Sequence, residues 1–375
     1  MVSLAVSDVN IGISFGGEQV ISSELYLGLN AKYKECYPIN IIVKRGVLNQ
    51  AFIGPVIPIL KSKNASRVIS YILRRAKLIN LFSRILIRKF QSVDILISNN
   101  PMDFLLSRRL SFKNLIIIKH DPVDIPTRAG KSYLKRVDFL VKKSSKYRLV
   151  ALNKKDYNDL VKIFGIDKVK LIYNGVLYND DIPTVDLGAF IKKDFKNKFV
   201  ILSLGRLQES QKQISKLILA ASKLRNKDFI IIIAGNGPDK DYYTKLTESL
   251  GLSDKVIFTG FVPDDVKISL YRIADVFVQP SQNESFGLTT LEAMHYGSIV
   301  LTTRNKGSIE IIDDKKNGFF INSDPSEIAE KIDFVNSLTE SERNNIKHKA
   351  IEKSNYFSYD KMLLSYIQLI NGFFS

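Results

Sequence analysis

The distribution of apolar residues along the chain constrains the fold more than any other feature. Ten segments rich in Ile, Val and Leu have the length of buried strands, and helical patterns separate most of them. These segments are residues 39–43, 93–98, 115–119, 148–152, 170–173, 199–204, 229–234, 256–259, 276–279 and 299–302. Because strands that are apolar on both faces occur in parallel sheets covered by helices, the chain is predicted to be a doubly wound α/β protein, and the pattern occurs twice.

The length of the chain and a polar seam predict two domains. Its 375 residues are enough to bury two cores. The stretch 177–196 breaks the α/β rhythm, and a new strand–turn–helix unit begins after it. We therefore expect an N-terminal domain over residues 1–180 and a C-terminal domain over residues 196–355. The apolar-striped helix expected at about 356–375 would cap the second domain or return to the first.

The single cysteine and the N-terminal residues predict a cytoplasmic protein. Cys36 has no second cysteine with which to form a disulfide in the chain, and this fits a reducing compartment. Residues 1–15 lack the basic region of a signal peptide and include Asp8. No apolar run approaches the roughly 20 residues that span a bilayer.

The net charge predicts an anionic partner. Lys and Arg number 55 against 38 Asp and Glu, which gives a formal net charge of +17. Nucleic acid, an anionic membrane or a phosphorylated ligand would each fit this charge. The sequence has no zinc-finger, RNA-recognition or helix-turn-helix signature and no Trp. A basic nucleic-acid-binding protein is therefore kept only as an alternative, and no nucleic-acid partner is expected.

Two segments of the N-terminal half concentrate basic residues. Residues 67–90 contain seven Lys or Arg and no acid, with apolar residues on the same helical face as several of the cations. Residues 128–148 contain eight Lys or Arg against one Asp. A basic face mixed with apolar residues suits an anionic membrane surface, so we expect peripheral membrane association through this domain. Helices with one face in the core would show a similar pattern.

The segment SLGRLQESQKQ places two cations after a predicted strand. Arg206 and Lys212 lie six residues apart in the turn between strand 199–204 and a helix predicted over 214–224. Ligands of open α/β sheets bind beyond the carboxyl ends of the strands. These side chains could hold a diphosphate and offset the charge that develops as it leaves. A solvated loop in a basic protein is the alternative.

The segment AGNGPDKD follows the buried strand 229–234. Gly235 and Gly237 would let the backbone approach a ligand closely, or would simply form a tight turn. Asp239 and Asp241 form an acid-x-acid pair that could bind a metal, but we prefer a place in the first turn of a helix, where acids favour the dipole. No cluster of His, Cys, Asp and Glu has metal-ligand spacing, so no metal site is predicted.

The segment PSQNESFGLTTLEAMHYG carries two glutamates eight residues apart. Glu284 lies in the loop after strand 276–279, residues 285–288 open a helix, and Glu292 falls in its second turn. The helix N-terminus offers N–H groups to a phosphate. A carboxylate can accept hydrogen bonds from two neighbouring hydroxyls, so the glutamates suit glycosyl and ribose groups. Two surface acids are the alternative.

Together these segments resemble the retaining family-4 glycosyltransferases of GT-B fold. ESFGLTTLEAMHYG is similar to the family signature with two glutamates, and GRL…QK to its phosphate-binding arginine and lysine. Similar motifs are SFGGEQVISSEL near the start, KHD with His120, YNGV before the seam, and GSIEIIDDKKNGFFI after the signature. The chain departs from the family pattern at Gln213, where glycine is usual, and at Ile299, where proline is usual.

The resemblance implies two Rossmann-like domains that face each other across a cleft, with the last helix crossing back to the first domain. It implies a nucleotide-sugar donor, retention at the anomeric carbon, and no required metal or other cofactor, with the base against the loop 260–263. The implied catalytic residues are His120, Arg206, Lys212 and Glu284. The implied donor-binding residues are Gly16, Gly17, Arg206, Lys212, Gly235, Val262, Glu284, Ser285, Phe286, Gly287, Leu288 and Glu292.

The expected function is transfer of a hexose, with UDP-sugar as the first choice of donor, to a glycan or lipid-linked glycan. The expected location is the cytoplasmic face of the membrane, in bacterial surface polysaccharide or lipopolysaccharide synthesis. A nucleotide-sugar epimerase or a phosphorylase on the same fold is the alternative, because a fold does not determine its chemistry.

Overall fold

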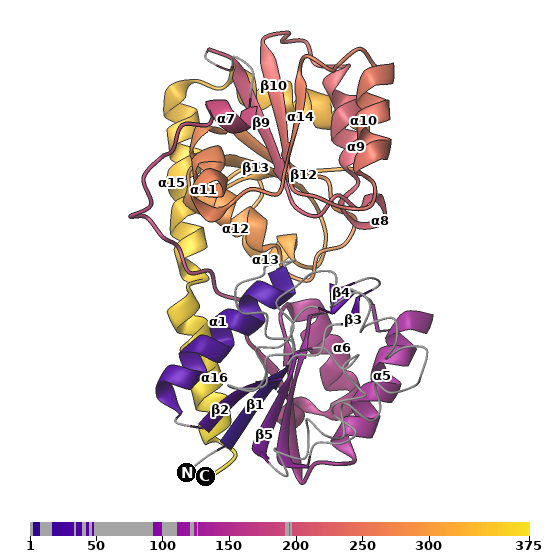
Figure 1. Cartoon of the computed structure of the whole chain (residues 1–375), viewed down its shortest axis with the longest axis vertical. Coiled ribbons are helices and arrows are strands. Elements are labelled where there is room, and N and C mark those ends of the chain that lie inside the picture. The colour runs from indigo at the N-terminus through magenta and orange to yellow at the C-terminus, as the bar shows by residue number, and fades with distance from the viewer. Residues whose placement is uncertain are drawn as a thin grey trace. The chain divides into compact units, whose positions relative to one another are not determined.

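The computed structural model describes residues 3–7, 17–33, 35–39, 43–44, 47–48, 93–99, 111–120, 124–125, 127–191, 195 and 197–375 (Figure 1). The chain divides into two compact units. The first unit comprises Met1–Tyr173 and Met362–Ser375, and the second comprises Asn174–Lys361. Among the described residues, no helix has both the length and the apolar composition that a bilayer span requires.

The first unit contains a six-stranded parallel sheet in the order β2-β1-β5-β6-β7-β8. The strands are β1 (Ser3–Ser7), β2 (Glu35–Ile39), β5 (Val93–Ser98), β6 (Phe112–Lys119), β7 (Lys146–Ala151) and β8 (Val169–Leu171). A separate antiparallel pair is formed by β3 (Val43–Lys44) and β4 (Val47–Leu48).

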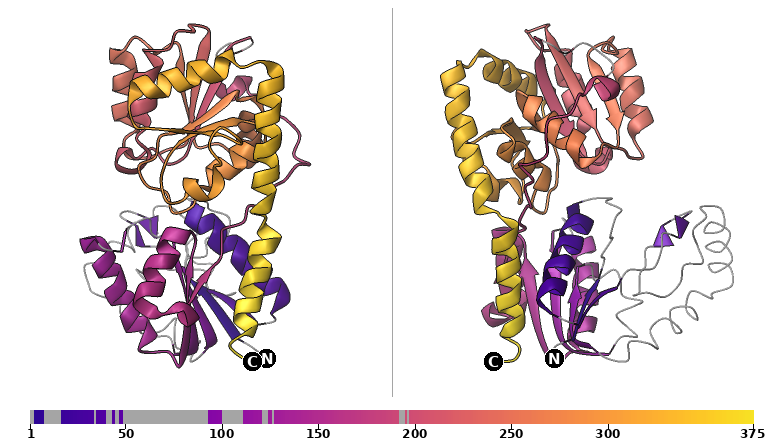
Figure 2. Two further views of the ribbon diagram at one scale, coloured as in Figure 1. Left: turned by 180° about the vertical axis from the view of Figure 1, so that it is seen from behind. Right: turned by 60° about the vertical axis from the view of Figure 1, so that its left-hand side comes forward.

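Helices lie on both faces of this sheet, as the apolar strands require (Figures 1 and 2). On one face lie α1 (Gly17–Lys32) and the part of α16 (Tyr359–Asn371) that belongs to this unit. On the other face lie α5 (Arg128–Val141) and α6 (Lys154–Phe164), and the short helix η2 (Ile166–Lys168) precedes β8. The two helices α5 and α6 bury Tyr133, Val137, Leu140 and Leu160 against the strands.

The second unit contains a six-stranded parallel sheet in the order β11-β10-β9-β12-β13-β14. The strands are β9 (Phe199–Leu204), β10 (Phe229–Ala234), β11 (Val256–Gly260), β12 (Val276–Gln279), β13 (Ile299–Thr303) and β14 (Phe319–Ile321). The helices are α7 (Gly188–Ile191), α8 (Glu209–Lys212), α9 (Ile214–Ala221), α10 (Lys240–Ser249), α11 (Asp264–Ile273), α12 (Leu288–His295), α13 (Ser308–Ile311), α14 (Pro325–Ser337) and α15 (Glu340–Tyr356).

Alternation along β9 shows why the strands of this unit carry apolar side chains on both faces. Phe199 and Ile201 belong to the core cluster that α9, α10 and α14 close on one face. The intervening Val200 and Leu202 are equally buried but lie outside that cluster, because successive side chains of a strand point to opposite faces of the sheet. Each face therefore removes its own apolar side chains from water, and neither tolerates a polar alternation.

The strand predictions are confirmed most closely in the second unit. Strands 93–98, 199–204, 229–234 and 276–279 have the predicted bounds. The strand predicted over 39–43 meets β2 (Glu35–Ile39) and β3 only at its two ends, and residues 40–42 lie outside the described part of the chain. The prediction missed β1, in which Ser3 and Ser7 flank only three apolar residues, and the three-residue β14.

The polar seam of the sequence is held on the surface of the second unit. The guanidinium of Arg272 on α11 donates to the carbonyl oxygens of Asp180 (3.2 Å) and Ile182 (2.6 Å). Leu187, just before α7, and Ile191, the last residue of α7, are buried. Two buried apolar side chains and one arginine thus hold residues 180–191 against this unit, although the composition of these residues is typical of a linker.

An ion pair lies inside the first unit, between β6 and α6. Lys119 Nζ is 3.5 Å from Asp156 Oδ2, and the two side chains are 1% and 0% exposed. Asp156 Oδ2 also accepts a hydrogen bond from Asn153 Nδ2 at 3.0 Å, and the ammonium lies over the ring of Tyr133. Removal of one charge would leave the other buried without its counter-ion.

We predict that Asp156→Ala lowers the free energy of unfolding by about 3–5 kcal/mol, because it leaves the buried Lys119 ammonium without this carboxylate as its counter-ion. Asp138→Ala is the matched control, since Asp138 pairs with Lys142 on the exposed side of α5 and such pairs contribute at most about 1 kcal/mol. Urea denaturation followed by circular dichroism measures both. Equal losses in the two variants would contradict a structural role for the buried pair.

Candidate active site

The strand order of the second unit predicts where a ligand binds. Successive strands run outward from β9 through β10 to β11 on one side, and from β12 through β13 to β14 on the other. The order therefore reverses between β9 and β12. In open α/β sheets the crevice at the carboxyl ends of the two strands at such a switch point is the usual ligand site. Arg206 and Lys212 follow β9, and Glu284 follows β12, so three predicted side chains belong to this point.

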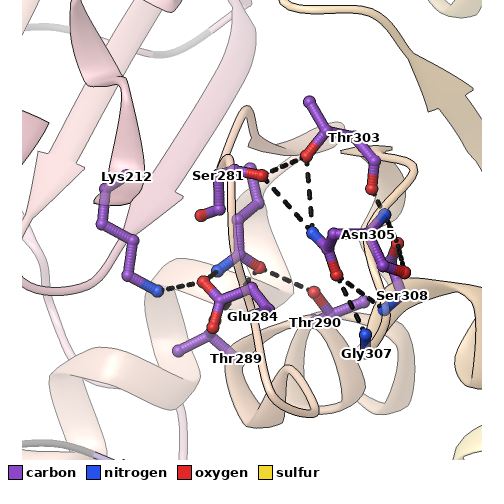
Figure 3. Close-up of polar contacts among 10 residues, drawn as sticks. Lys212, Ser281, Glu284, Thr289, Thr290, Thr303, Asn305, Gly307 and Ser308 are labelled. Carbon is purple, nitrogen blue, oxygen red and sulfur yellow. Dashed lines mark hydrogen bonds and ion pairs between the residues drawn. The ribbon is translucent and has the colours of Figure 1, made fainter. Parts of the chain in front are cut away.

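Lys212 and Glu284 are joined directly (Figure 3). The Lys212 ammonium forms an ion pair and hydrogen bond with Glu284 Oε1, and the two side chains are only 17% and 18% exposed. Gln279 Nε2 donates to the same carboxylate oxygen at 2.9 Å. Gln279 Oε1 in turn accepts from Thr290 Oγ1 at 2.7 Å, so the carboxylate is oriented through a chain of hydrogen bonds.

The backbone of Glu284 is fixed by the loop that follows β13. Gly307 N donates to the carbonyl oxygen of Glu284 at 3.1 Å. Asn305 Oδ1 accepts from the backbone N–H groups of Gly307 (3.1 Å) and Ser308 (2.9 Å), which closes a tight turn (Figure 3). A Cβ on Gly307 would lie 2.3 Å from the carbonyl oxygen of Phe286, so this approach requires glycine.

Helix α12 begins where the sequence predicted. Gly287 is its N-cap with φ 110°, a left-handed conformation suited to glycine. Phe286 is buried and packs edge-on against Phe357, whereas Ser285 and Leu288 are half-buried. The first turn therefore presents backbone N–H groups of the kind that bind phosphate, on a helix anchored by an apolar side chain.

Glu292 lies in the second turn of α12 and pairs with two side chains of α11. Lys267 Nζ is 2.9 Å from Oε1, and Tyr271 Oη donates to Oε2 at 2.9 Å. Burial alone would lower the pKa of Lys267, but the charges of Glu292 and Asp264 outweigh it and raise that pKa. Burial and the Glu292 charge raise the pKa of Tyr271 well above its ordinary value. Glu292 thus has a permanent cation and a permanent hydroxyl donor beside it.

The backbones after β9 and β10 approach closely. Gly235 has φ +131°, and a Cβ there would lie 1.9 Å from the carbonyl oxygen of Gly205. Gly235 N also donates to the carbonyl oxygen of Gly260, at the end of β11, at 2.8 Å. In the next loop Val262 is buried while Phe261 is 70% exposed. Close packing of the backbone therefore explains why glycine is needed at position 235, whether or not Gly235 contacts a donor.

Arg206 and Gln213 show how the loop after β9 is shaped. The Arg206 guanidinium is exposed and makes no hydrogen bond or ion pair with any residue that the structure describes, so it can turn toward an anion. Gln213 stands where the related family has glycine, and it adopts the left-handed conformation (φ 50°, ψ 39°). Its Oε1 accepts from Ser323 Oγ at 3.1 Å, which helps to hold a conformation that glycine would adopt without strain.

Asp239 acts in a different way from the one predicted. It precedes α10 as the N-cap residue, but its side chain makes no cap hydrogen bond to that helix. Its Oδ2 accepts from Glu209 N at 2.7 Å and so caps the start of α8, the helix that carries Lys212. Only Asp241 lies in the first turn of α10. Across the described part of the chain, no three His, Cys, Asp or Glu side chains are grouped so as to hold a metal.

The predicted residues of the first unit follow the carboxyl ends of its strands. His120, at the end of β6, is buried, and its Nε2 lies 3.3 Å from Asn99 Oδ1 beyond β5. Burial lowers the pKa of His120 to about 3, so the imidazole is neutral near pH 7. Gly17 begins α1 after β1, and Gly16 lies outside the described residues, as does the basic segment 67–90. The second basic segment forms α5, the turn after it and the start of β7, and Arg128, Lys131 and Lys135 of α5 are exposed.

Several residues of the site were missed by the sequence analysis. Gln279 orients Glu284, Lys267 and Tyr271 hold Glu292, and Asn305 shapes the turn at Gly307. A polar residue that ends an apolar strand was a signal for Gln279. The spacing of four residues between Lys267 and Tyr271 put both on one helical face, but their partner on α12 is a tertiary contact that local spacing does not show.

A model of a known protein family matches most of the second unit. Residues 189–353, which lie within the second unit, match the family described as glycosyl transferases group 1. An uncharacterized glycosyltransferase of Methanocaldococcus jannaschii is 35% identical over 229 residues, which are 57% of this chain and 57% of that protein. The chain thus spans little more than half the length of this relative.

Solved structures show the same fold over almost the whole chain. Anabaena Alr3699/HepE, solved in complex with UDP and glucose, has a TM-score of 0.71 at 18% identity and covers 99% of this chain and 100% of its own. WaaG, a glycosyltransferase involved in lipopolysaccharide biosynthesis, has a TM-score of 0.67 at 16% identity and covers 99% and 100%. With its two parallel-sheet units, the chain has the GT-B fold, and the predicted fold class is confirmed.

We predict that Gly235→Ala destabilises the second unit strongly, because the new Cβ would meet the Gly205 carbonyl oxygen at 1.9 Å. Gly251→Ala is the matched control: φ there is +66°, but a Cβ would meet nothing within 4 Å, so only the left-handed conformation costs about 1–2 kcal/mol. Thermal unfolding compares the two. A smaller loss at Gly235 than at Gly251 would contradict the close packing of the strand ends.

Proposed function

We propose that this protein is a retaining glycosyltransferase that transfers a hexosyl group from a nucleotide-diphosphate sugar. The observation that carries the proposal is the convergence of Arg206, Lys212 and Glu284 at the β9/β12 switch point, with Glu292 in the helix that starts there. Cations for a diphosphate and carboxylates for hydroxyl groups are the two kinds of side chain that such a donor needs.

The cations take the diphosphate in this proposal. Lys212 uses one N–H on Glu284, and an ammonium has three, so two can serve phosphate oxygens. The exposed guanidinium of Arg206 adds a planar donor that matches phosphate. Backbone N–H groups at the start of α12 complete the set. Charge that develops on the leaving diphosphate is thereby neutralised by the protein, and no metal is assigned to the reaction.

The carboxylates orient the rest of the donor. Glu292 accepts the ribose hydroxyls, Glu284 contacts the transferred sugar, and the base lies against the loop with Val262. The chemical step forms a bond between an acceptor oxygen and the anomeric carbon as the bond from that carbon to the phosphate oxygen breaks. The acceptor proton passes to an oxygen of the departing phosphate on the same face, so the configuration is retained. An inverted product in an NMR assay would reject this step.

We assign UDP-sugar as the donor and a glycan or lipid-linked glycan as the acceptor. The solved complex of Anabaena Alr3699/HepE with UDP and glucose, and the lipopolysaccharide role of WaaG, are consistent with both assignments. The exposed cations of α5 and the net charge of +17 favour a protein that acts peripherally at an anionic membrane, on its cytoplasmic face. Bacterial surface polysaccharide or lipopolysaccharide synthesis is the corresponding process.

Other enzymes on this fold differ in what they do without an acceptor. An epimerase would convert a nucleotide sugar in the absence of any second substrate, and a phosphorylase would require inorganic phosphate. Nucleic acid is the remaining alternative for a basic chain, and a gel shift at physiological salt tests it. Nucleoside diphosphate binding that depends on Arg206 or Lys212 would favour the transferase and its fold relatives over the nucleic-acid alternative.

We predict that UDP or GDP selectively raises the melting temperature of the protein, because a ligand that binds only the folded state stabilises it by mass action, by about 2.7 kcal/mol at a hundred times its Kd. Arg206→Met and Glu292→Gln are expected to abolish the shift. Lys223→Met, a change in an exposed residue just after α9, is the control and should keep it. No shift with any nucleoside diphosphate or nucleotide sugar would reject the proposed donor site.

The low pKa of His120, about 3, predicts that this residue does not titrate in the working range. We expect His120→Asn to lower the transfer rate. Because His120 does not titrate between pH 5 and 8, the substitution should leave the limbs of the pH–rate profile in that range unchanged. The profile of the wild type and the variant, measured with the same donor and acceptor, checks this. A limb near pH 6.5 that disappears in the variant would show instead that His120 exchanges a proton during catalysis.

A further inference from the structure

Two side chains of α11 clamp the carboxylate of Glu292 from one side. Lys267 and Tyr271 lie four residues apart, hence one helical turn apart, on the face that meets α12. The ammonium reaches Oε1 and the phenol reaches Oε2, each at 2.9 Å. The contacts are divided evenly, with one donor on each carboxylate oxygen.

The clamp is rigid because its aromatic half is packed on every side. Tyr271 is fully buried, stacks on Tyr296 with ring centroids 6.2 Å apart, and meets Phe277 of β12 edge-on at 5.7 Å. Its hydroxyl therefore cannot follow Glu292 into another rotamer. Lys267 is restrained by a second ion pair with Asp264, 3.1 Å away.

The carboxylate of Glu292 can still accept one hydrogen bond at each oxygen, which suits a pair of neighbouring hydroxyl groups. A carboxylate can accept about four hydrogen bonds, two at each oxygen. Lys267 and Tyr271 are its only side-chain partners among the residues that the structure describes, and they use one site on each oxygen. Each oxygen therefore keeps acceptor capacity for one further donor, and two vicinal hydroxyl groups can supply one donor to each oxygen.

We propose that Lys267 and Tyr271 are positioning residues that orient Glu292 to accept both the 2′- and 3′-hydroxyls of the donor ribose, and that they set the preference of the site for ribonucleotides over 2′-deoxyribonucleotides. This inference rests on the proposed donor site at Glu292. Without the clamp the carboxylate can rotate and satisfy a single hydroxyl equally well. Loss of the clamp therefore reduces discrimination rather than binding as such.

The test compares the Kd of UDP and GDP with those of their 2′-deoxy counterparts by calorimetry. The wild type is expected to bind the ribonucleotide of its preferred base about tenfold more tightly, the effect of one hydrogen bond to a charged group. Tyr271→Phe removes one oxygen atom and keeps the packing, and Lys267→Met keeps the stem. Each variant is expected to reduce the ratio to about threefold or less.

Lys245→Met is the control, because Lys245 is exposed on α10 and is not a partner of Glu292 or of the two clamp residues. It should retain the tenfold ratio. Unchanged ratios in both Tyr271→Phe and Lys267→Met would overturn the positioning role while leaving the donor site intact. A wild type that binds nucleoside diphosphates without preferring ribose would overturn the inference through Glu292, and one that binds neither UDP nor GDP would overturn the proposed function as well.

Discussion

Burial of both faces of each sheet is the constraint on which the second unit depends. Strands such as β9 and β10 carry apolar side chains on both faces, and the charged side chains lie in helices and in loops beyond the strand ends. The reversal of strand order between β9 and β12 then opens one place where loops from two strands diverge. Arg206, Lys212 and Glu284 follow those two strands and share that place as a consequence of topology.

Short-range packing converts this place into an ordered site. Glycines at 235 and 307 let backbones meet at distances that a Cβ would forbid, and Asp239 caps the helix that carries Lys212. Glu284 and Glu292 are each held by two side-chain partners before any ligand arrives. A site whose charged groups are already oriented needs little rearrangement to bind a diphosphate or to stabilise it as it leaves.

The sequence predicted the parallel sheets and the charged side chains well, and predicted their partners poorly. Continuous apolar runs gave β9, β10 and β12 with their observed bounds, because burial on both faces leaves a strong local signal. The partners of Glu292 and the cap formed by Asp239 depend on contacts between helices, which no local pattern contains. Gln213 adopts the glycine-like conformation with the aid of Ser323, a residue far along the chain.

The proposed function requires that the second unit bind a nucleoside diphosphate through cations at the β9/β12 switch point. The most direct measurement is the ratio of Kd values for UMP and UDP in the wild type and in Lys212→Met. The wild type is expected to bind UDP at least about tenfold more tightly than UMP, since the second phosphate gains a charge-assisted hydrogen bond. Lys212→Met is expected to remove this advantage. Equal affinities in the wild type, or an unchanged ratio in the variant, would contradict this requirement.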